Sequence, residues 1–143
     1  MTRVEKAYAY VVSAGRLLVF THRDVSLLET GVQVPGGTVR PGEAPEAAVL
    51  REVREETGYE TFEVRRALGT ADYRVGDVTH HRHFFQLAPT APLPETWEAA
   101  ERHDGLRAPT AFVLSWLPLA HGHVLAAGLG ALLHGVQDTG VQG

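Results

Sequence analysis

Residues 36–60, GGTVRPGEAPEAAVLREVREETGYE, constrain the fold more than any other segment, because they carry the start and stop signals of a helix. Pro45 suits the first helical turn, where its missing N–H costs nothing, although Ala44 before it is a poor N-cap. Gly58 stands at the usual position of a C-terminal stop. The segment therefore predicts a helix that begins at Pro45 and ends before Gly58.

Three glutamates lie close together near the end of this helix. At about 100° per residue, Glu52, Glu55 and Glu56 share an arc of roughly 100°. Like-charge pairs at this spacing cost roughly 0.2–0.5 kcal/mol each, and acids in the last turn lose roughly 0.3–1 kcal/mol more. A bound Mg²⁺ or Mn²⁺ would offset this repulsion, since hard cations prefer oxygen ligands. The alternative interpretation is a solvated acidic face.

The same geometry predicts which face of the helix packs against the protein. Leu50, Val53 and Thr57 fall on a face that neighbours the glutamates, with Ala47 beyond them. We expect this stripe to be buried against a sheet. Arg51 precedes Glu55 by four residues, a spacing at which the two side chains can pair.

Short runs of β-forming residues separated by turn signals occupy much of the remaining chain. The runs predicted as strands are VEKAYAYVV, RLLVFTHR, TFEVRRALGTADYRV (one or two strands), HHRHFFQLAP and AFVLSWLPL. The first two are joined by Ser13-Ala14-Gly15, which predicts an antiparallel hairpin. After a brief extended piece, Pro35-Gly36-Gly37 reads as a loop.

The later chain is predicted to contain a long loop and a second helix. Residues 90–110 are rich in proline and polar residues, with a possible helical turn around Glu95–Glu101, and Val124–Leu133 reads as helix. The order strands, helix, strands, helix predicts an α+β protein, an α/β/α sandwich with a mixed β-sheet. We expect one domain over 1–143, with a flexible tail at 136–143.

Composition excludes several classes of protein. The formal net charge of −4 argues against a general nucleic-acid-binding surface, which would be basic. The chain has no cysteine, so disulfides and zinc–thiolate sites are excluded. We find no signal peptide and no apolar run long enough for a membrane span. The expected protein is cytoplasmic, with no membrane and no nucleic-acid partner; a homodimer remains possible.

A longer pattern surrounds the three glutamates. In order, it is Gly37, five residues, Glu43, seven residues, Arg51, Glu52, the aliphatic Val53, one residue, Glu55, Glu56, one residue, Gly58 and Tyr59. This spacing resembles the signature of the Nudix hydrolases, in which an aliphatic residue is usual where this chain has Tyr59. Strands before and after the segment also look like the α/β/α sandwich of that family.

The resemblance implies an activity and a set of site residues. Nudix enzymes typically hydrolyse a pyrophosphate bond in a nucleoside diphosphate linked to another moiety, with Mg²⁺ and with Mn²⁺ as a substitute. Arg51 would position the carboxylates, and Glu43 would support the loop by hydrogen bonding. The implied catalytic residues are Glu52, Arg51 and Glu55, and the implied metal ligands are Glu52, Glu55, Glu56 and the Gly36 carbonyl. The number of ions is open.

The general base is not fixed by the pattern. In parts of the family a glutamate from a later loop does this work, so Glu52 competes with Glu95, Glu98 and Glu101. The alternative is that these three later glutamates are ordinary surface acids.

Candidate substrate-binding residues lie outside the pattern. They are Arg23, Arg40, Tyr73 and His83, each with an ordinary surface or packing role as the alternative; Trp97 could also stack on a base, and His81 with His83 could form a histidine metal site. By elimination among substrate signatures, we favour a nucleoside triphosphate or a related small nucleotide. The rival hypotheses are a non-catalytic Nudix-fold sensor of a nucleotide metabolite, an interaction domain with an acidic face, and a different reaction on the same fold.

Overall fold

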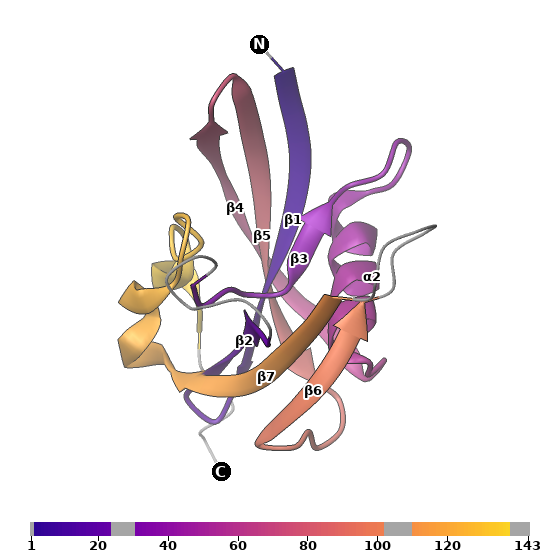
Figure 1. The fold of residues 1–143 in the computed structure, drawn as a ribbon, viewed down its shortest axis with the longest axis vertical. Helices are drawn as coiled ribbons and strands as arrows, with labels where there is room; N and C mark the ends of the chain where they lie inside the picture. Colours follow the sequence, from indigo (N-terminus) through magenta and orange to yellow (C-terminus); the bar gives the residue numbers. More distant parts are fainter. Residues whose placement is uncertain (1, 24–30, 102–109, 138–143) are drawn as a thin grey trace.

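A computed structural model describes residues 2–23, 31–101 and 110–137 of the chain, excluding the side chains of Glu101 and Thr110. The elements, in chain order, are β1 (Thr2–Ser13), β2 (Arg16–His22), β3 (Gly36–Thr38), α2 (Pro45–Thr57), β4 (Phe62–Val75), β5 (Val78–Pro89), β6 (Thr96–Glu101), β7 (Thr110–Pro118), and the 3₁₀ helices η1 (Leu119–Val124) and η2 (Leu133–Gly135). Figure 1 shows their arrangement.

The strands form one seven-stranded sheet with the order β4-β5-β1-β2-β7-β6, and β3 pairs with β1 beside this path. β1 runs parallel to β5, whereas the other strand pairs are antiparallel. The predicted mixed sheet and the β1–β2 hairpin are therefore confirmed. β4 is a single strand, whose register with β5 shifts between Val64 and Arg66 and again between Ala67 and Gly69.

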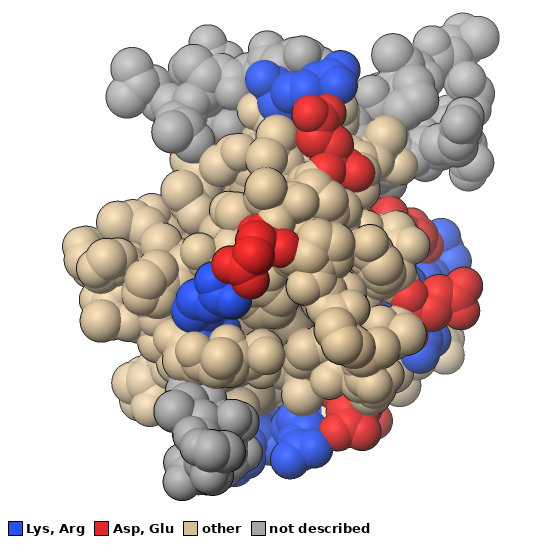
Figure 2. Space-filling model, turned by 90° about the horizontal axis from the view of Figure 1, so that it is seen from below, with Lys and Arg blue, Asp and Glu red and all other residues tan. Residues whose placement is uncertain are grey.

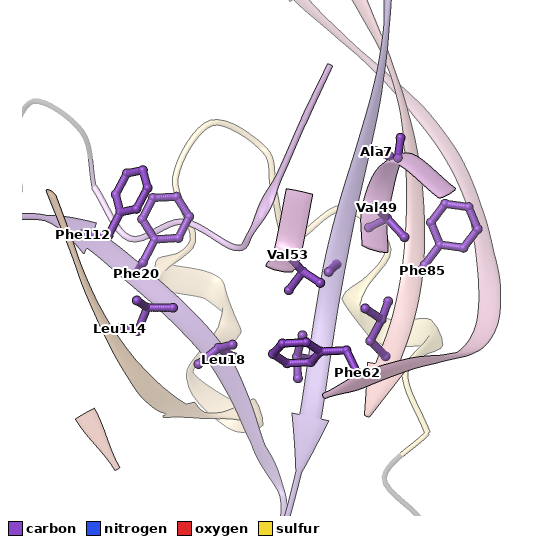
Figure 3. Close-up of a cluster of buried hydrophobic side chains, with 13 residues drawn as sticks. Ala7, Leu18, Phe20, Val49, Val53, Phe62, Phe85, Phe112 and Leu114 are labelled. Atoms are coloured by element: carbon purple, nitrogen blue, oxygen red, sulfur yellow. The ribbon is translucent and has the colours of Figure 1, made fainter. Parts of the chain in front are cut away.

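Helix α2 covers one face of the sheet and has the predicted bounds. Its N-cap Ala44 makes no side-chain hydrogen bond, and Gly58 adopts the left-handed conformation at φ 79°. Val49 and Val53 are fully buried among sheet side chains such as Ala7 and Phe85 (Figure 3). The main hydrophobic core therefore lies between α2 and the sheet.

The predicted apolar stripe of α2 is only partly correct. Val53 and Thr57 are buried, but Leu50 is half-buried and Ala47 is exposed. Ala48, Val49 and two glutamates, Glu52 and Glu56, complete the buried side. The helix is rotated toward the glutamates because β3 packs against that side and supplies polar backbone there.

The prediction of a second helix at Val124–Leu133 is wrong. The chain forms η1, a series of turns and η2, and α2 is the only α-helix within the described residues. Ala127 and Gly128 have φ values of 53° and 71°, which a right-handed helix cannot contain. This segment nevertheless packs on the other face of the sheet, where Leu129 joins a second core cluster with Tyr10 and Phe84.

Two segments predicted as loops form strands instead. Thr96–Glu101 pairs with β7 as edge strand β6, so the predicted helical turn around Glu95–Glu101 is wrong, and residues 102–109 lie outside the described ranges. Gly36 and Gly37 belong to β3, opposite Tyr8 and Ala7 of β1. In both places, pairing with a neighbouring strand outweighs local propensity.

The predicted tail begins within the described part of the chain. Val136 packs against the second core cluster. The backbone N–H of Gln137 donates to Gln86 Oε1 at 2.9 Å. Residues 138–143, which make up the rest of the predicted tail, lie outside the described ranges.

The surface carries charges of both signs. Figure 2, seen from below relative to Figure 1, shows Lys and Arg side chains in small groups beside Asp and Glu side chains. The described part of this face shows no continuous basic surface. Among the described helices, none has the length and apolar character needed to cross a membrane.

Replacing Leu18 with alanine tests the core between the sheet and α2. Leu18 is fully buried in this cluster, so Leu18→Ala should lower the free energy of unfolding by about 2–5 kcal/mol. Val75→Ala is the control, because Val75 is 51% exposed and should change stability by less than about 0.5 kcal/mol. Urea denaturation measures both; equal losses would contradict this placement of the core.

Candidate metal-binding and active site

The glutamates on α2 differ in burial. Glu52 and Glu56 are only 9% and 6% exposed, whereas the Glu55 side chain is 41% exposed. Glu52 and Glu56 lie one helical turn apart on the side of α2 that contacts β3. Two buried carboxylates at this separation are costly unless other groups compensate their charge. The groups around them therefore determine what the site can do.

Two glycines of β3 make close approach of the carboxylates possible. The Gly36 N–H donates to Glu56 Oε1 at 2.8 Å. A Cβ atom on Gly37 would lie 2.6 Å from the Glu52 carboxyl carbon, and one on Gly36 would lie 2.4 Å from the Ala7 carbonyl oxygen. Gly36 therefore has no room for a side chain, and any side chain at Gly37 would displace the Glu52 carboxylate, so both carboxylates lie against the β3 backbone.

Arg51 binds the acidic residues together. Its Nε and Nη2 donate to the two carboxylate oxygens of Glu43, each at 2.9 Å. Its Nη1 donates to Glu52 at 2.8 Å and, less closely, to Glu55 at 3.4 Å, and its Nη2 also donates to the Thr38 carbonyl at 3.0 Å. The predicted Arg51–Glu55 pair is present, but the two-point contact with Glu43 is the stronger one.

This network shifts the titration of both partners. The hydrogen bonds from Arg51, followed by the N–H of Arg40, lower the pKa of the Glu43 carboxyl to about 2. The hydrogen bond to Glu43 raises the pKa of the Arg51 guanidinium above its ordinary value. Both groups therefore stay charged at any physiological pH.

Lys6 is a site residue that the sequence did not reveal. Its Nζ donates to Thr38 Oγ1 at 2.9 Å, and its ammonium interacts electrostatically with Glu52 and Glu56. Burial lowers the pKa of the Lys6 ammonium, against the opposing attraction of Glu52. Lys6 is the only lysine of the chain, and it places a cation beside the buried carboxylates.

A second group missed from the sequence is a stack of side chains on the same face of β1 as Lys6. The Arg82 guanidinium lies 5.3 Å from the ring centre of Tyr8 and 4.2 Å from that of Tyr73. Arg82 is 4% exposed and donates to the Ala127 carbonyl at 2.6 Å. Of these three residues, only Tyr73 was predicted from the sequence as a substrate-binding candidate. Alternation along β1 and β5 could have revealed Tyr8 and Arg82 if the β1–β5 pairing had been known.

The other predicted substrate-binding residues are dispersed. Arg40 is exposed on the loop between β3 and α2. Arg23 donates to Glu98 Oε1 at 2.8 Å, at the end of β2. His83 lies on the opposite face of β5 from Arg82, where its Nε2 is 2.9 Å from Glu5 Oε1. Of the four candidates, only Tyr73 lies in the stack next to Lys6.

The later-loop candidates for the general base also have partners. Glu95 makes a two-point contact with Arg16, at 2.7 and 2.9 Å, which lowers the pKa of its carboxyl. Glu98 is bonded to Arg23, which follows the other end of β2 from Arg16. The side chain of Glu101 lies outside the described set. Among these candidates, Glu52 alone lies on α2 within the acidic cluster.

Trp97 packs at the end of α2, and its role as a base-stacking residue stays a prediction. Its Nε1–H donates to the Thr57 carbonyl at 2.8 Å, and its ring meets that of Tyr59 edge to face at 5.4 Å. Tyr59 is the residue that departs from the usual aliphatic position of the sequence pattern. The aromatic pair thus explains this departure as packing at the helix exit.

The donor set of this site fits Mg²⁺ or Mn²⁺. Two buried carboxylates, a more exposed third and close backbone supply hard oxygen ligands on a rigid element. Among the described residues, the histidines that form a group of potential metal ligands, His81 and His83, do so with Glu5 and not with these glutamates. The chain has no cysteine. The glutamates of α2 are therefore candidate ligands for a hard divalent cation, close to the ammonium of Lys6.

Two solved structures illustrate the similarity of this fold to that of known proteins. A MutT NUDIX hydrolase from Burkholderia pseudomallei superimposes with a TM-score of 0.64 at 22% identity, covering 96% of this chain and 100% of that one. A MutT protein from Methanosarcina mazei Go1 gives a TM-score of 0.66 at 20% identity, with 93% and 91% covered. At these identities the likeness establishes the fold.

The NUDIX domain family model matches residues 4–127, and the chain belongs to this family of hydrolases. A relative named RNA pyrophosphohydrolase, from Hydrogenovibrio crunogenus, is 40% identical over 62 residues. That match covers 42% of this chain and 38% of the relative, so the chain spans well under half of the relative's length.

Glu43→Gln tests the charge network through its dependence on pH. Because the folded-state pKa of Glu43 is about 2 against an ordinary 4.5, its carboxylate contributes stability above about pH 4.5. That contribution is lost as pH falls toward about 2. Wild type should therefore be more stable than Glu43→Gln at pH 6, with the difference shrinking on acidification. Urea denaturation at several pH values measures it; a difference independent of pH would contradict the network.

Proposed function

We propose that this protein is a metal-dependent hydrolase that cleaves a pyrophosphate bond in a nucleoside diphosphate-linked substrate. One observation carries the proposal above all: Glu52 and Glu56 are buried side by side against the glycines of β3, with a lysine ammonium next to them. Such a cluster is costly in itself and becomes favourable when it holds a divalent cation and a polyphosphate.

The proposed ligands are Glu52, Glu55, Glu56 and the Gly36 carbonyl. A Mg²⁺ or Mn²⁺ ion bound there supplies charge neutralisation for phosphate oxygens and lowers the pKa of a bound water. Arg51 keeps Glu52 in place through its contact at 2.8 Å, and Glu43 fixes Arg51 in turn. The chain thus holds its ligands in position before substrate arrives, which is the contribution that phosphoryl transfer needs.

Glu52 is the proposed general base. It lies within the acidic cluster, and Arg51 orients its carboxylate. Glu95 is held by Arg16, at the β1–β2 hairpin end of β2, away from strand β3 that carries Gly36. Glu98 is bonded to Arg23 and would have to leave that partner to act. In this assignment Glu52 accepts the proton of the attacking water.

Substrate recognition is assigned to the face of β1 and β5 beside the cluster. Lys6 is placed to bind a phosphate oxygen, because its ammonium lies close to the charges of Glu52 and Glu56 and donates to Thr38 on β3. Tyr8 and Tyr73, which are partly exposed and flank the buried Arg82 guanidinium, supply aromatic rings on the same side. Aromatic rings stack on a nucleobase whatever its identity, because every base has a π-face. A nucleoside triphosphate or a related small nucleotide is the substrate that we favour.

A substrate panel with Mg²⁺ and Mn²⁺ tests the reaction. It contains nucleoside triphosphates, dinucleoside polyphosphates, nucleotide sugars and ADP-ribose, together with an RNA bearing a 5′ polyphosphate, because a relative is named RNA pyrophosphohydrolase. Hydrolysis in ¹⁸O water locates the attacked phosphorus. Metal-dependent cleavage of any one substrate supports the proposal. Binding of nucleotides without turnover would favour the rival hypothesis, a non-catalytic sensor.

Glu56→Gln removes one charged ligand while preserving the shape of the side chain. We expect kcat to fall by at least about 100-fold, as for loss of one well-placed charged group, with an unchanged circular dichroism spectrum. Glu46→Gln is the matched control, because Glu46 is an exposed acid in the first turn of the same helix. A Glu56→Gln enzyme with near-wild-type turnover would refute the ligand assignment.

A further inference from the structure

A second group of potential metal ligands lies on the sheet, apart from the acidic cluster. Glu5 of β1 and His81 and His83 of β5 each offer a ligand atom, and these three atoms lie within 4.8 Å of one another. Glu5 Oε1 and His83 Nε2 are 2.9 Å apart, and the two imidazole rings meet edge to face at 5.0 Å. All three side chains are partly exposed, so solvent reaches them.

The pairing of the strands brings these residues together. In the parallel β1–β5 register, Glu5 is opposite His81 and Ala7 is opposite His83. Residues two apart on a strand share a face, so both histidines point to the same side as Glu5. That side continues into Phe85, which belongs to the core beneath α2. In Figure 1 the N-terminal half of β1 and the β4–β5 hairpin extend beyond α2.

The sheet separates this group from the substrate-binding face. Lys6 and Arg82 alternate with Glu5, His81 and His83 along their strands and therefore point to the opposite side. The chemistry also differs, since Mg²⁺ prefers oxygen ligands, whereas two imidazoles and a carboxylate suit Zn²⁺ and its neighbours in the transition series. The two groups of ligands can thus take different ions.

Asp72 strengthens the interpretation of a built site. It stands opposite His81 on β4, and its Oδ1 is 2.6 Å from His81 Nδ1. This contact places the Nδ1 proton toward Asp72 and leaves the Nε2 lone pair of His81 free for a metal. Histidines that bind metals commonly use their second nitrogen in this way, which fixes the ring and raises its basicity.

We propose that Glu5, His81 and His83 bind one divalent transition-metal ion, with Zn²⁺ as the favoured ion and Asp72 as the outer partner of His81. A tetrahedral zinc with ligands at about 2.0–2.1 Å needs ligand atoms roughly 3.3 Å apart. The Glu5–His83 pair is already near that spacing, and the ligand atom of His81 lies within 4.8 Å of both. Water takes the fourth position.

One competing interaction sets the strength of the site. Arg3 Nε donates to Glu5 Oε2 at 2.9 Å, which leaves Oε1 as the oxygen nearer the histidines. Binding must therefore compete with a salt bridge on the same carboxylate, at the exposed end of β1. The alternative is that Glu5 and Asp72 only form hydrogen bonds with the two histidines. The experiment separates these two cases.

The test is a Zn²⁺ titration followed by calorimetry at neutral pH, in the presence of excess Mg²⁺. Wild type should bind one more equivalent of Zn²⁺ than His81→Ala/His83→Ala, and Glu5→Gln should weaken that site at least about 10-fold. His121→Ala/His123→Ala is the control, because these rings form a similar histidine pair, with centres 6.5 Å apart. The control should retain the full stoichiometry.

A second readout uses the wild-type protein alone, so it does not depend on the folding of any variant. On addition of Zn²⁺, the imidazole NMR signals of His81 and His83 should shift and saturate together at one equivalent, before those of other histidines. Equal stoichiometry in wild type and the double variant would overturn the proposal. So would the absence of any shift at these two rings when Zn²⁺ is in excess. Neither readout depends on catalytic turnover, so failure here is distinct from failure of the proposed reaction.

Discussion

The contact between Arg51 and Glu43 is the interaction on which the site depends. It joins the loop before α2 to the middle of that helix, and it leaves one guanidinium nitrogen to orient Glu52. The same guanidinium reaches the Thr38 carbonyl on β3. One partly buried arginine thus connects the loop, the helix and the strand, and it holds Glu52 in place among them.

The glycines of β3 and the ammonium of Lys6 complete this arrangement. Gly36 and Gly37 allow the carboxylates to lie against backbone, where side chains would collide with Ala7 and Glu52. Lys6 brings a positive charge to the same place from β1, on the face that also carries Arg82 between two tyrosines. The acidic cluster, the ammonium of Lys6 and two aromatic rings therefore lie on neighbouring parts of the protein, which supports the function that we propose.

Local signals in the sequence were sufficient for some features and insufficient for others. Pro45 and Gly58 predicted the bounds of α2, because helix starts and stops depend on neighbouring residues. The helix predicted at Val124–Leu133 failed because the left-handed backbone at Ala127 and Gly128 is fixed by packing on the sheet. Edge strand β6 was missed for a related reason: its pairing with β7 is not a local property.

The site shows the same division between local and non-local information. The spacing from Gly37 to Tyr59 pointed to Arg51 and the glutamates, since they share one helix and the loop before it. Lys6 and Arg82 became visible only when the parallel β1–β5 pairing was known, because alternation shows which residues share a face but not which strands are neighbours. The contact of Trp97 with Thr57 likewise depends on the position of β6 beside α2, which the local sequence does not specify.

The most direct test of the central claim is anomalous diffraction from crystals of the wild-type protein grown with Mn²⁺. We predict a manganese peak within coordination distance of the Glu52 and Glu56 carboxylates, with Arg51 still bonded to Glu43. Crystals saturated with Mn²⁺ that show no ion at these two side chains would contradict the account, whatever the enzyme does in solution.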